Sequence, residues 1–255
     1  MSEIGLGTRK YRGGTEPLRQ GLELGAVFVD TAEVYGTEEV VGEAVRDRRE
    51  CVVLATKVAG EHLGYDDVLR AAQQSLKRLG IECIDLYQVH WPSARIPIKE
   101  TMRAMETLVD EGKVRHIGVS NFSTRELEEA QGALSKYPLV SNQVLYNLCR
   151  RDIEQELLPY CEQYQMTVIA YTPLADGRLA GAAETDQDPS LRQLAQIARE
   201  LHKSPGQVAL NWLTAHPAVV AIPKSNSGTR VVENCQASGW RLPPDTVQQL
   251  SQAFS

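Results

Sequence analysis

The sequence predicts a (β/α)8 barrel, an α/β fold in which eight parallel strands alternate with helices. Eight short apolar runs recur along the 255 residues. Several of these runs are continuous rather than alternating, as is typical of strands buried on both faces of a parallel sheet. Between them the apolar residues take helical spacing, and most successive runs start roughly 25–33 residues apart, the length of one strand-and-helix unit.

The expected strands follow one another from the amino terminus. They comprise residues 4–8, 27–32, 51–58, 84–91, 116–121, 141–147, 167–174 and 219–224. The last interval is longer because residues 189–216 contain two helical patterns rather than one. Residues 175–188 are small and polar, and we interpret them as the loop after the seventh strand. Since no segment resembles a linker, we expect a single domain over residues 1–255.

Capping signals mark the starts of several expected helices. In a capping box, a short polar residue before the first turn is followed three positions later by glutamate or glutamine. This spacing occurs at Ser123 and Glu126, at Asp152 and Gln155, and at Ser204 and Gln207. Pro205 strengthens the last of these, because proline is favoured at the first helical position.

A doubly wound open sheet is the alternative fold with the same alternation of strands and helices. That fold would favour a G-x-G-x-x-G phosphate-binding sequence after an early strand. Residues 5–10 (GLGTRK) lack the third glycine of this sequence. The barrel is therefore the preferred prediction.

Composition narrows the class of protein. The net charge of −6 gives no broad electrostatic reason to bind nucleic acid or an anionic membrane. No apolar stretch approaches the roughly 20 residues of a transmembrane helix, and the amino terminus lacks the apolar core of a signal peptide. The five cysteines are odd in number and form no C-x-x-C pair, which favours reduced thiols. We expect a cytoplasmic protein.

Four polar residues close, or closely follow, three successive apolar runs. They are Asp30, Tyr35, Lys57 and His90. In a parallel barrel the carboxyl ends of the strands, with the loops after them, form one rim where active sites lie. We therefore expect a carboxylate, a phenol, an ammonium and an imidazole to meet there.

This set of groups suits proton donation to a carbonyl oxygen. The ordinary pKa of a phenol, about 10, is too high for efficient donation at neutral pH, and a nearby ammonium such as Lys57 should lower it. Asp30 would be the counter-ion of Lys57, and His90 would orient the substrate oxygen or pass on a proton. Tyr35 would then be the acid toward an oxygen that becomes negative, while the hydride must come from a cofactor.

Each of these residues also has a purely structural interpretation. Asp30 could cap the following turn, Tyr35 could pack in the turn before Gly36, and His90 could be a hydrogen-bonded core histidine. Lys57 is harder to explain in this way, because burying an unpaired ammonium is costly. Their joint occurrence at three successive strand ends favours a shared site.

Across nearly its whole length the chain resembles the aldo-keto reductases, most closely their compact bacterial members. The motifs that carry the resemblance are FVDTAEVYG, ATKV, IDLYQVHWP, GKVRHIGVSNFS, SNQVLYN, IAYTPL and AIPKSNSGTRVVEN, in that family's order. The resemblance implies an NADPH-dependent enzyme that reduces aldehydes or ketones to alcohols, of the alcohol dehydrogenase (NADP+) type. It also implies a catalytic tetrad formed by Asp30, Tyr35, Lys57 and His90, with Tyr35 as the proton donor.

The resemblance further implies which residues bind NADPH. Ser120, Asn121 and Gln143 would hydrogen-bond the nicotinamide carboxamide, and Tyr171 would stack on the ring. The contacts expected along the pyrophosphate and at the adenosine end are Thr172, Leu174, Lys224, Ser225, Arg230 and Asn234.

The preference for NADPH over NADH has its own physical argument. Lys224 and Arg230 flank an expected helix start at residues 226–229, where amide donors and the helix dipole favour a phosphate. Arg230 could instead pair with Glu233. Ser120 and Asn121 could likewise serve only as helix caps, and Gln143 and Tyr171 could be ordinary interior residues.

The chain departs from the family pattern in its first residues. It begins almost directly at the first strand, so we expect the barrel to lack the usual amino-terminal hairpin plug, as a native feature or as a truncation. The position after Gly7-Thr8 is commonly aromatic in relatives but is Arg9 here, which could bind a substrate carboxylate or hydroxyl or could point to solvent. Because the loop after His90 and the carboxyl tail are short, we expect an open substrate pocket with Trp91 as its main aromatic wall.

Two other functions are weighed against carbonyl reduction. A barrel that binds nucleotide as a sensor or partner subunit would show little turnover, although the intact tetrad argues against it. A metal-dependent hydrolase on the same fold would need ligands that the five scattered histidines do not supply, so no metal is expected. We expect a monomer acting on a small carbonyl compound.

Overall fold

The computed structural model describes residues 3–255. Within these residues, eight parallel strands form one sheet in the order β1 to β8, so each strand pairs with the next along the chain. The strands are β1 (Leu6–Gly7), β2 (Phe28–Asp30), β3 (Val53–Val58), β4 (Ile84–Val89), β5 (Val114–Ser120), β6 (Leu139–Leu145), β7 (Thr167–Tyr171) and β8 (Val219–Ala221). All eight expected strands are confirmed, with shifts of a few residues at their ends.

The sheet curls until its first and last strands meet. The amide of Gly5 donates to the carbonyl oxygen of Ala221 at 2.8 Å, and the amide of Gly7 donates to that of Pro223 at 3.2 Å. Ile4 and Ala221 form a parallel bridge beside them. These bonds close the (β/α)8 barrel predicted from the sequence.

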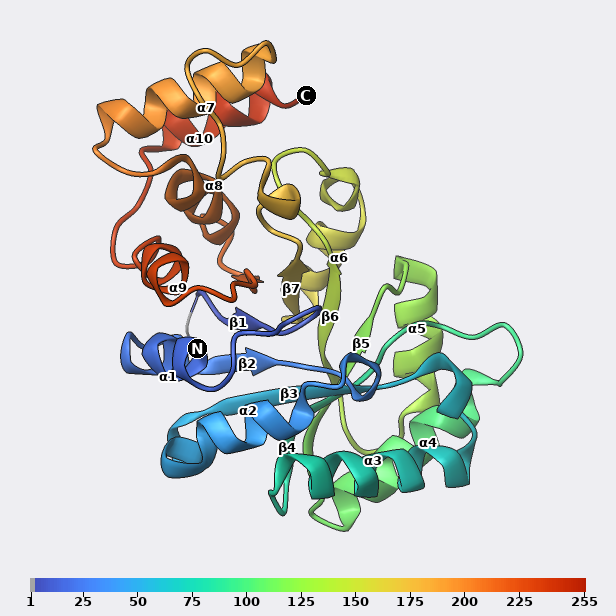
Figure 1. Cartoon of the computed structure of the whole chain (residues 1–255). Coiled ribbons are helices and arrows are strands. Elements are labelled where there is room, and N and C mark those ends of the chain that lie inside the picture. Colours follow the sequence, from blue (N-terminus) through green and yellow to red (C-terminus); the bar gives the residue numbers. More distant parts are fainter. Residues whose placement is uncertain (1–2) are drawn as a thin grey trace.

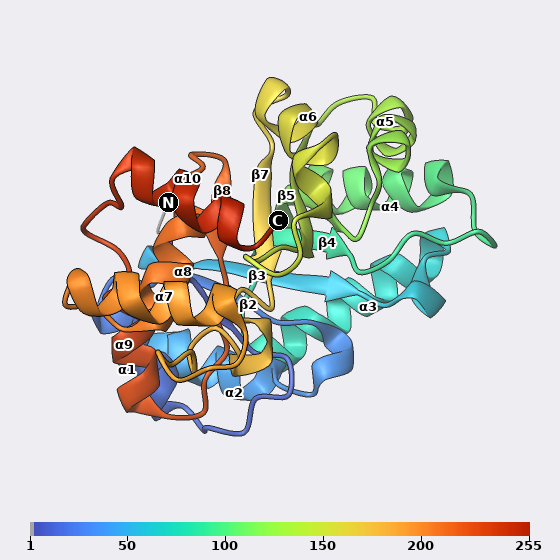
Figure 2. The same ribbon diagram turned by 90° about the horizontal axis from the view of Figure 1, so that it is seen from above.

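Helices cover the outside of the sheet (Figures 1 and 2). They are α1 (Glu16–Glu23), α2 (Glu38–Val45), α3 (Tyr65–Leu79), α4 (Ile98–Asp110), α5 (Thr124–Ala133), α6 (Leu157–Gln163), α7 (Pro189–Glu200), α8 (Pro205–Thr214), α9 (Gly228–Cys235) and α10 (Pro244–Ala253). In both views α1 lies beside α9, so the first and last parts of the chain adjoin in the outer layer as well as in the sheet. The two helices expected in residues 189–216 are α7 and α8.

Helix α3 illustrates how local sequence fixes these elements. Its buried residues recur at helical spacing and form one face toward the sheet: Val68, Ala71, Ala72, Ser75, Leu76 and Leu79. Gly80 ends the helix with a φ of 66°, and its amide donates back to the carbonyls of the last turn. Glycine adopts this left-handed conformation without the steric cost that other residues pay.

Two of the three expected capping boxes are present. The Ser123–Glu126 and Ser204–Gln207 pairs each exchange side-chain and backbone hydrogen bonds at the starts of α5 and α8. The prediction at Asp152 is wrong, because residues Asp152–Glu154 form a separate 3-10 turn and α6 starts only at Leu157. Pro159 lies in the first turn of α6, where it needs no intrahelical hydrogen bond, and this favours the later start.

The barrel interior is layered, because alternate residues of each strand point inward. One layer is apolar and consists of Phe28, Ala55, Leu86, Ile169, Val220 and Ile222. Two residues further along the same strands, Asp30, Lys57 and Gln88 occupy the interior nearer the carboxyl ends. Apolar packing below and polar groups above therefore arise from the same two-residue period.

The amino-terminal part of the barrel begins with β1. No hairpin precedes β1 in residues 3–255. The apolar interior layer lies between this end of the barrel and the polar layer. No helix within the described residues combines the length and apolar character needed to cross a bilayer.

Candidate active site

The strand ends bring the four predicted catalytic residues to one rim. Asp30 is the last residue of β2, Lys57 lies near the end of β3, and His90 follows β4 directly. Tyr35 ends a one-turn 3-10 helix (Glu33–Tyr35) in the loop after β2. Gly36 follows with a φ of 66°, a left-handed turn that lets the chain leave this short helix and start α2.

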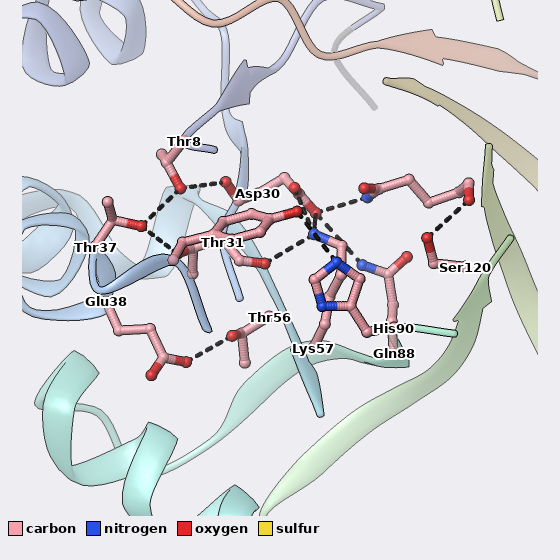
Figure 3. A network of polar contacts seen from close by, with 12 residues as sticks. Thr8, Asp30, Thr31, Thr37, Glu38, Thr56, Lys57, Gln88, His90 and Ser120 are labelled. Atoms are coloured by element: carbon pink, nitrogen blue, oxygen red, sulfur yellow. Dashed lines mark hydrogen bonds and ion pairs between the residues drawn. The ribbon is translucent and has the colours of Figure 1, made fainter. Parts of the chain in front are cut away.

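Lys57 and Asp30 form a fully buried ion pair (Figure 3). The ammonium nitrogen lies 2.7 Å from Asp30 Oδ1 and 2.8 Å from Oδ2, and it also donates to the Thr31 carbonyl oxygen at 2.9 Å. The side chain of Lys57 has no solvent exposure. Since an ammonium has three protons, these contacts satisfy it entirely.

Asp30 also accepts hydrogen bonds from two side-chain amides. Gln143 Nε2 donates to Asp30 Oδ2 at 2.7 Å, and Gln88 Nε2 approaches the same oxygen at 3.4 Å. Gln88 was missed in the sequence analysis, although a signal was present. It stands two residues before His90 in an apolar run, so the strand period places it inside the barrel.

Tyr35 and His90 form the exposed half of the tetrad. The Tyr35 hydroxyl lies 3.3 Å from His90 Nε2, and the two rings meet edge to face with centroids 5.5 Å apart. The Lys57 ammonium lies 5.1 Å from the centroid of the Tyr35 ring. The four groups converge, but among the described contacts no hydrogen bond joins the Tyr35 hydroxyl to Lys57.

Burial controls the protonation of the tetrad. It lowers the pKa of Lys57, an effect opposed by Asp30. Burial, together with Lys57 and Arg9, lowers the pKa of His90 to about 4, so its imidazole is neutral at neutral pH. Burial, followed by the Asp30 charge, raises the pKa of Tyr35, and Arg9 opposes this rise.

The pKa shift of Tyr35 is opposite to the one expected from the sequence. Lys57 was expected to lower this pKa, but its charge is compensated by Asp30 at hydrogen-bonding distance. Desolvation of the phenolate is therefore the larger effect. Tyr35 remains protonated throughout the neutral range, as a proton donor must.

The depressed pKa of His90 predicts a specific pH dependence. Because the folded protein binds this proton only near pH 4, while an unfolded histidine binds it near about 6.5, the unfolded state is favoured as the pH falls between these values. The stability that His90 contributes is present above about pH 6.5 and is lost toward pH 4. We expect the melting temperature of His90→Gln to fall less than that of the wild type between pH 6.5 and 4.5. Equal falls would contradict the assignment.

Three threonine hydroxyls hold the backbone around Asp30. Thr8 Oγ1 donates to the Asp30 carbonyl oxygen at 2.9 Å, and Thr37 Oγ1 lies 3.0 Å from Thr8 Oγ1 and 2.8 Å from Thr31 Oγ1. Figure 3 shows this chain of hydroxyls beside the ion pair. The sequence analysis did not identify Thr8 or Thr37, because their partners come from separate elements.

A second set of side chains lines the rim on the opposite side. Asn121 Nδ2 donates to the His90 carbonyl oxygen and to Ser120 Oγ, both at 3.0 Å, and the Tyr171 hydroxyl donates to Asn121 Oδ1 at 3.0 Å. Ser120 Oγ donates to the Gln143 carbonyl oxygen at 2.9 Å. Polar side chains predicted from separate strands thus form one connected network.

A cavity of about 1080 Å³ opens over this rim. It is lined by every predicted site residue except the fully buried Lys57. These residues are Arg9, Asp30, Tyr35, His90, Trp91, Ser120, Asn121, Gln143, Tyr171, Thr172, Leu174, Lys224, Ser225, Arg230 and Asn234. The cavity extends from the tetrad to the start of α9.

Unusual backbone conformations concentrate around the cavity. In residues 3–255, seven non-glycine residues have a positive φ, and four of them line the cavity: Lys10, Asn121, Thr172 and Asp176. Such conformations are costly and cluster at binding sites where the surrounding structure enforces them. Asn147 Nδ2 donates to the Thr172 carbonyl oxygen at 2.9 Å and holds this part of the loop.

The far end of the cavity is suited to an anion. Lys224 and Arg230 are exposed there, and neither forms an ion pair within the described part of the chain. Ser227, at the start of α9, makes no side-chain cap, so the first amides of this helix are left without that partner. The alternative pairing of Arg230 with Glu233 is not formed, and the Glu233 carboxylate instead accepts a hydrogen bond from Ser204.

The aldo/keto reductase family model matches residues 3–254. The chain belongs to the aldo/keto reductase family. It is 39% identical to methylglyoxal reductase YeaE of Escherichia coli (strain K12) over 241 residues, covering 93% of this chain and 83% of that protein. It is 36% identical to glyoxal reductase of Bacillus subtilis (strain 168) over 256 residues, covering 98% and 88%.

The fold of this aldo/keto reductase is also that of solved relatives. An aldo/keto reductase from Klebsiella pneumoniae in complex with NADP and acetate superposes with a TM-score of 0.88 at 39% identity, covering 99% of this chain and 91% of that one. Residues 3–255 contain no group of three or more His, Cys, Asp or Glu side chains placed to hold a metal ion.

Proposed function

We propose that this aldo/keto reductase uses NADPH to reduce small aldehydes or ketones to alcohols, with Tyr35 as the general acid. The observation that carries the proposal is the convergence of the Tyr35 hydroxyl, His90 and the buried Lys57–Asp30 pair on one large cavity. Its relatives include a methylglyoxal reductase and a glyoxal reductase, and the Klebsiella relative binds NADP. These names support a small carbonyl substrate and a phosphorylated nicotinamide cofactor.

The residues along the cavity fit NADPH. Asn121, Ser120 and Gln143 offer amide and hydroxyl groups beside the tetrad, where the nicotinamide carboxamide would be held, and the Tyr171 ring is available for stacking. At the other end, Lys224 and Arg230 would hold the 2′-phosphate, with Ser225 and Asn234 at the adenosine. The bound nicotinamide would supply the hydride that none of the side chains can provide.

Tyr35 and His90 would act on the substrate oxygen. The neutral imidazole can direct Nε2 toward that oxygen, and the phenol can donate its proton as negative charge develops. Solvent would then restore the proton of Tyr35. Lys57 and Asp30 lie beneath the phenol and would stabilise the developing phenolate, although only as a nearly neutral pair.

Consumption of NADPH with a panel of small aldehydes tests the proposal. Absorbance at the reduced nicotinamide band should fall steadily with a substrate such as methylglyoxal, and the alcohol should form in equal amount. Tight NADPH binding without turnover would instead favour the alternative of a nucleotide-binding sensor or partner subunit.

Arg230→Ala should weaken NADPH binding much more than NADH binding. The guanidinium would lose its charge-assisted contact with a phosphate that NADH lacks, so we expect the Kd of NADPH to rise about tenfold or more. Titration calorimetry with both cofactors measures this difference. Arg199→Ala, at an exposed ion pair with Glu184 on α7, is the matched control and should leave both affinities unchanged. Equal losses for NADPH and NADH in Arg230→Ala would contradict the contact.

A further inference from the structure

We propose that Arg9 selects carbonyl substrates that carry a carboxylate, by binding that carboxylate at the mouth of the cavity. The inference rests on the proposed reduction and names its substrate class. It turns on one residue that the reaction itself does not use.

The position of Arg9 is fixed by its neighbours in the chain. Thr8, the preceding residue, is buried and donates its hydroxyl proton to the Asp30 carbonyl oxygen. The backbone therefore emerges at the rim directly beside the tetrad, and Arg9 lines the same cavity as Tyr35, His90 and Trp91. Its side chain is exposed to the cavity and solvent.

The charge of Arg9 acts on the site rather than on a protein counter-ion. Arg9 lowers the pKa of Tyr35, of His90 and of Tyr171, so its guanidinium lies near groups on three sides of the reaction space. Within residues 3–255 it makes no ion pair or side-chain hydrogen bond. An unpaired guanidinium beside a proton donor offers a planar, two-pronged site for a carboxylate.

Nearby acidic groups are already engaged elsewhere. Asp30 is buried and holds Lys57, and Glu33 accepts hydrogen bonds from the Ala59 amide and from His62. The phosphates of NADPH would be met by Lys224 and Arg230 at the far end of the cavity. The charge of Arg9 is therefore left for the substrate.

The remaining walls of the mouth are apolar. Val34 and Trp91 each have 53% of their surface exposed although both are large hydrophobic residues, and both line the cavity next to the tetrad. They suit the carbon skeleton of a ligand. A substrate would thus have a carbonyl at Tyr35 and His90, an aryl or short alkyl body against Trp91, and a carboxylate at Arg9.

A matched pair of aldehydes tests the selection. 4-Carboxybenzaldehyde carries the anion, and 4-carbamoylbenzaldehyde is a neutral compound of nearly the same shape. For the wild type we expect kcat/KM to be about tenfold or more higher for the acid, as a charge-assisted hydrogen bond gives. Arg9→Gln should abolish this preference through KM while still reducing the amide, and Arg9→Lys should retain part of it.

Arg12→Gln is the control for net charge. Arg12 lies three residues away, is exposed and does not line the cavity, so its replacement should leave the preference intact. If the wild type and Arg9→Gln reduce the amide and show the same ratio of acid to amide, the selection is wrong while the reduction stands. A loss of preference in Arg12→Gln equal to that in Arg9→Gln would also overturn it.

A binding measurement keeps the inference testable without turnover. Benzoate should bind the wild type, and titration calorimetry should show at least fivefold weaker binding to Arg9→Gln. Failure to reduce either aldehyde would overturn the proposed reduction, whereas equal benzoate affinity in the two proteins would overturn the role of Arg9.

Discussion

Tyr35→Phe should lower kcat for carbonyl reduction by about 10²- to 10⁴-fold, the usual contribution of a general acid. The substitution removes only the hydroxyl, which lies 3.3 Å from His90 Nε2, and keeps the ring that packs edge to face against the imidazole. NADPH affinity should change little, because the predicted cofactor contacts come from other residues. Steady-state kinetics and fluorescence titration with NADPH measure the two effects separately.

The matched control for this variant is Tyr137→Phe. The Tyr137 hydroxyl also donates a hydrogen bond, to Asp110 at 2.8 Å, but it lies outside the cavity. Its removal should leave turnover unchanged. Near-normal turnover in Tyr35→Phe would show that another group donates the proton, and His90 would be the next candidate.

Much of the fold could be predicted from local sequence signals. Continuous apolar runs identified the eight strands, and the capping boxes at Ser123 and Ser204 identified two helix starts. The same reasoning failed at Asp152, where the spacing is correct but the chain forms a 3-10 turn before α6. A capping signal states that a helix can start at a residue, and the packing of the following turn decides whether it does.

The candidate site was predictable where a polar residue interrupts an apolar strand end. Asp30, Lys57 and His90 stood out for this reason, and the strands bring them together. Gln88 carried the same signal but was read as part of the apolar run.

Interactions between distant elements lay beyond the sequence. The hydroxyl contacts of Thr8 with Thr37 join residues 29 positions apart, and no spacing rule connects them. The pKa direction of Tyr35 depended on burial and on the pairing of Lys57, which only the three-dimensional arrangement shows.

Lys57→Met should both abolish most turnover and lower the free energy of unfolding by about 3–5 kcal/mol, because it leaves a buried carboxylate without its counter-ion. Asp30 is only 2% exposed and would keep the hydrogen bonds of Gln143 and Gln88, which are neutral donors. Urea unfolding at neutral pH measures the loss of stability, and aldehyde-dependent oxidation of NADPH measures turnover. Stability within about 1 kcal/mol of the wild type would show that the pair is not needed to solvate Asp30.

The double variant Asp30→Asn/Lys57→Met separates the stabilising role of the ion pair from its chemical role. With no buried charge left, the penalty of the single variant should largely disappear, since replacing both partners of a buried pair is often close to neutral. Turnover should remain low, because the phenolate that forms at Tyr35 would have no cation beneath its ring. A double variant as unstable as Lys57→Met would attribute the loss to altered packing in the barrel. Recovery of both stability and turnover would remove Lys57 from the mechanism.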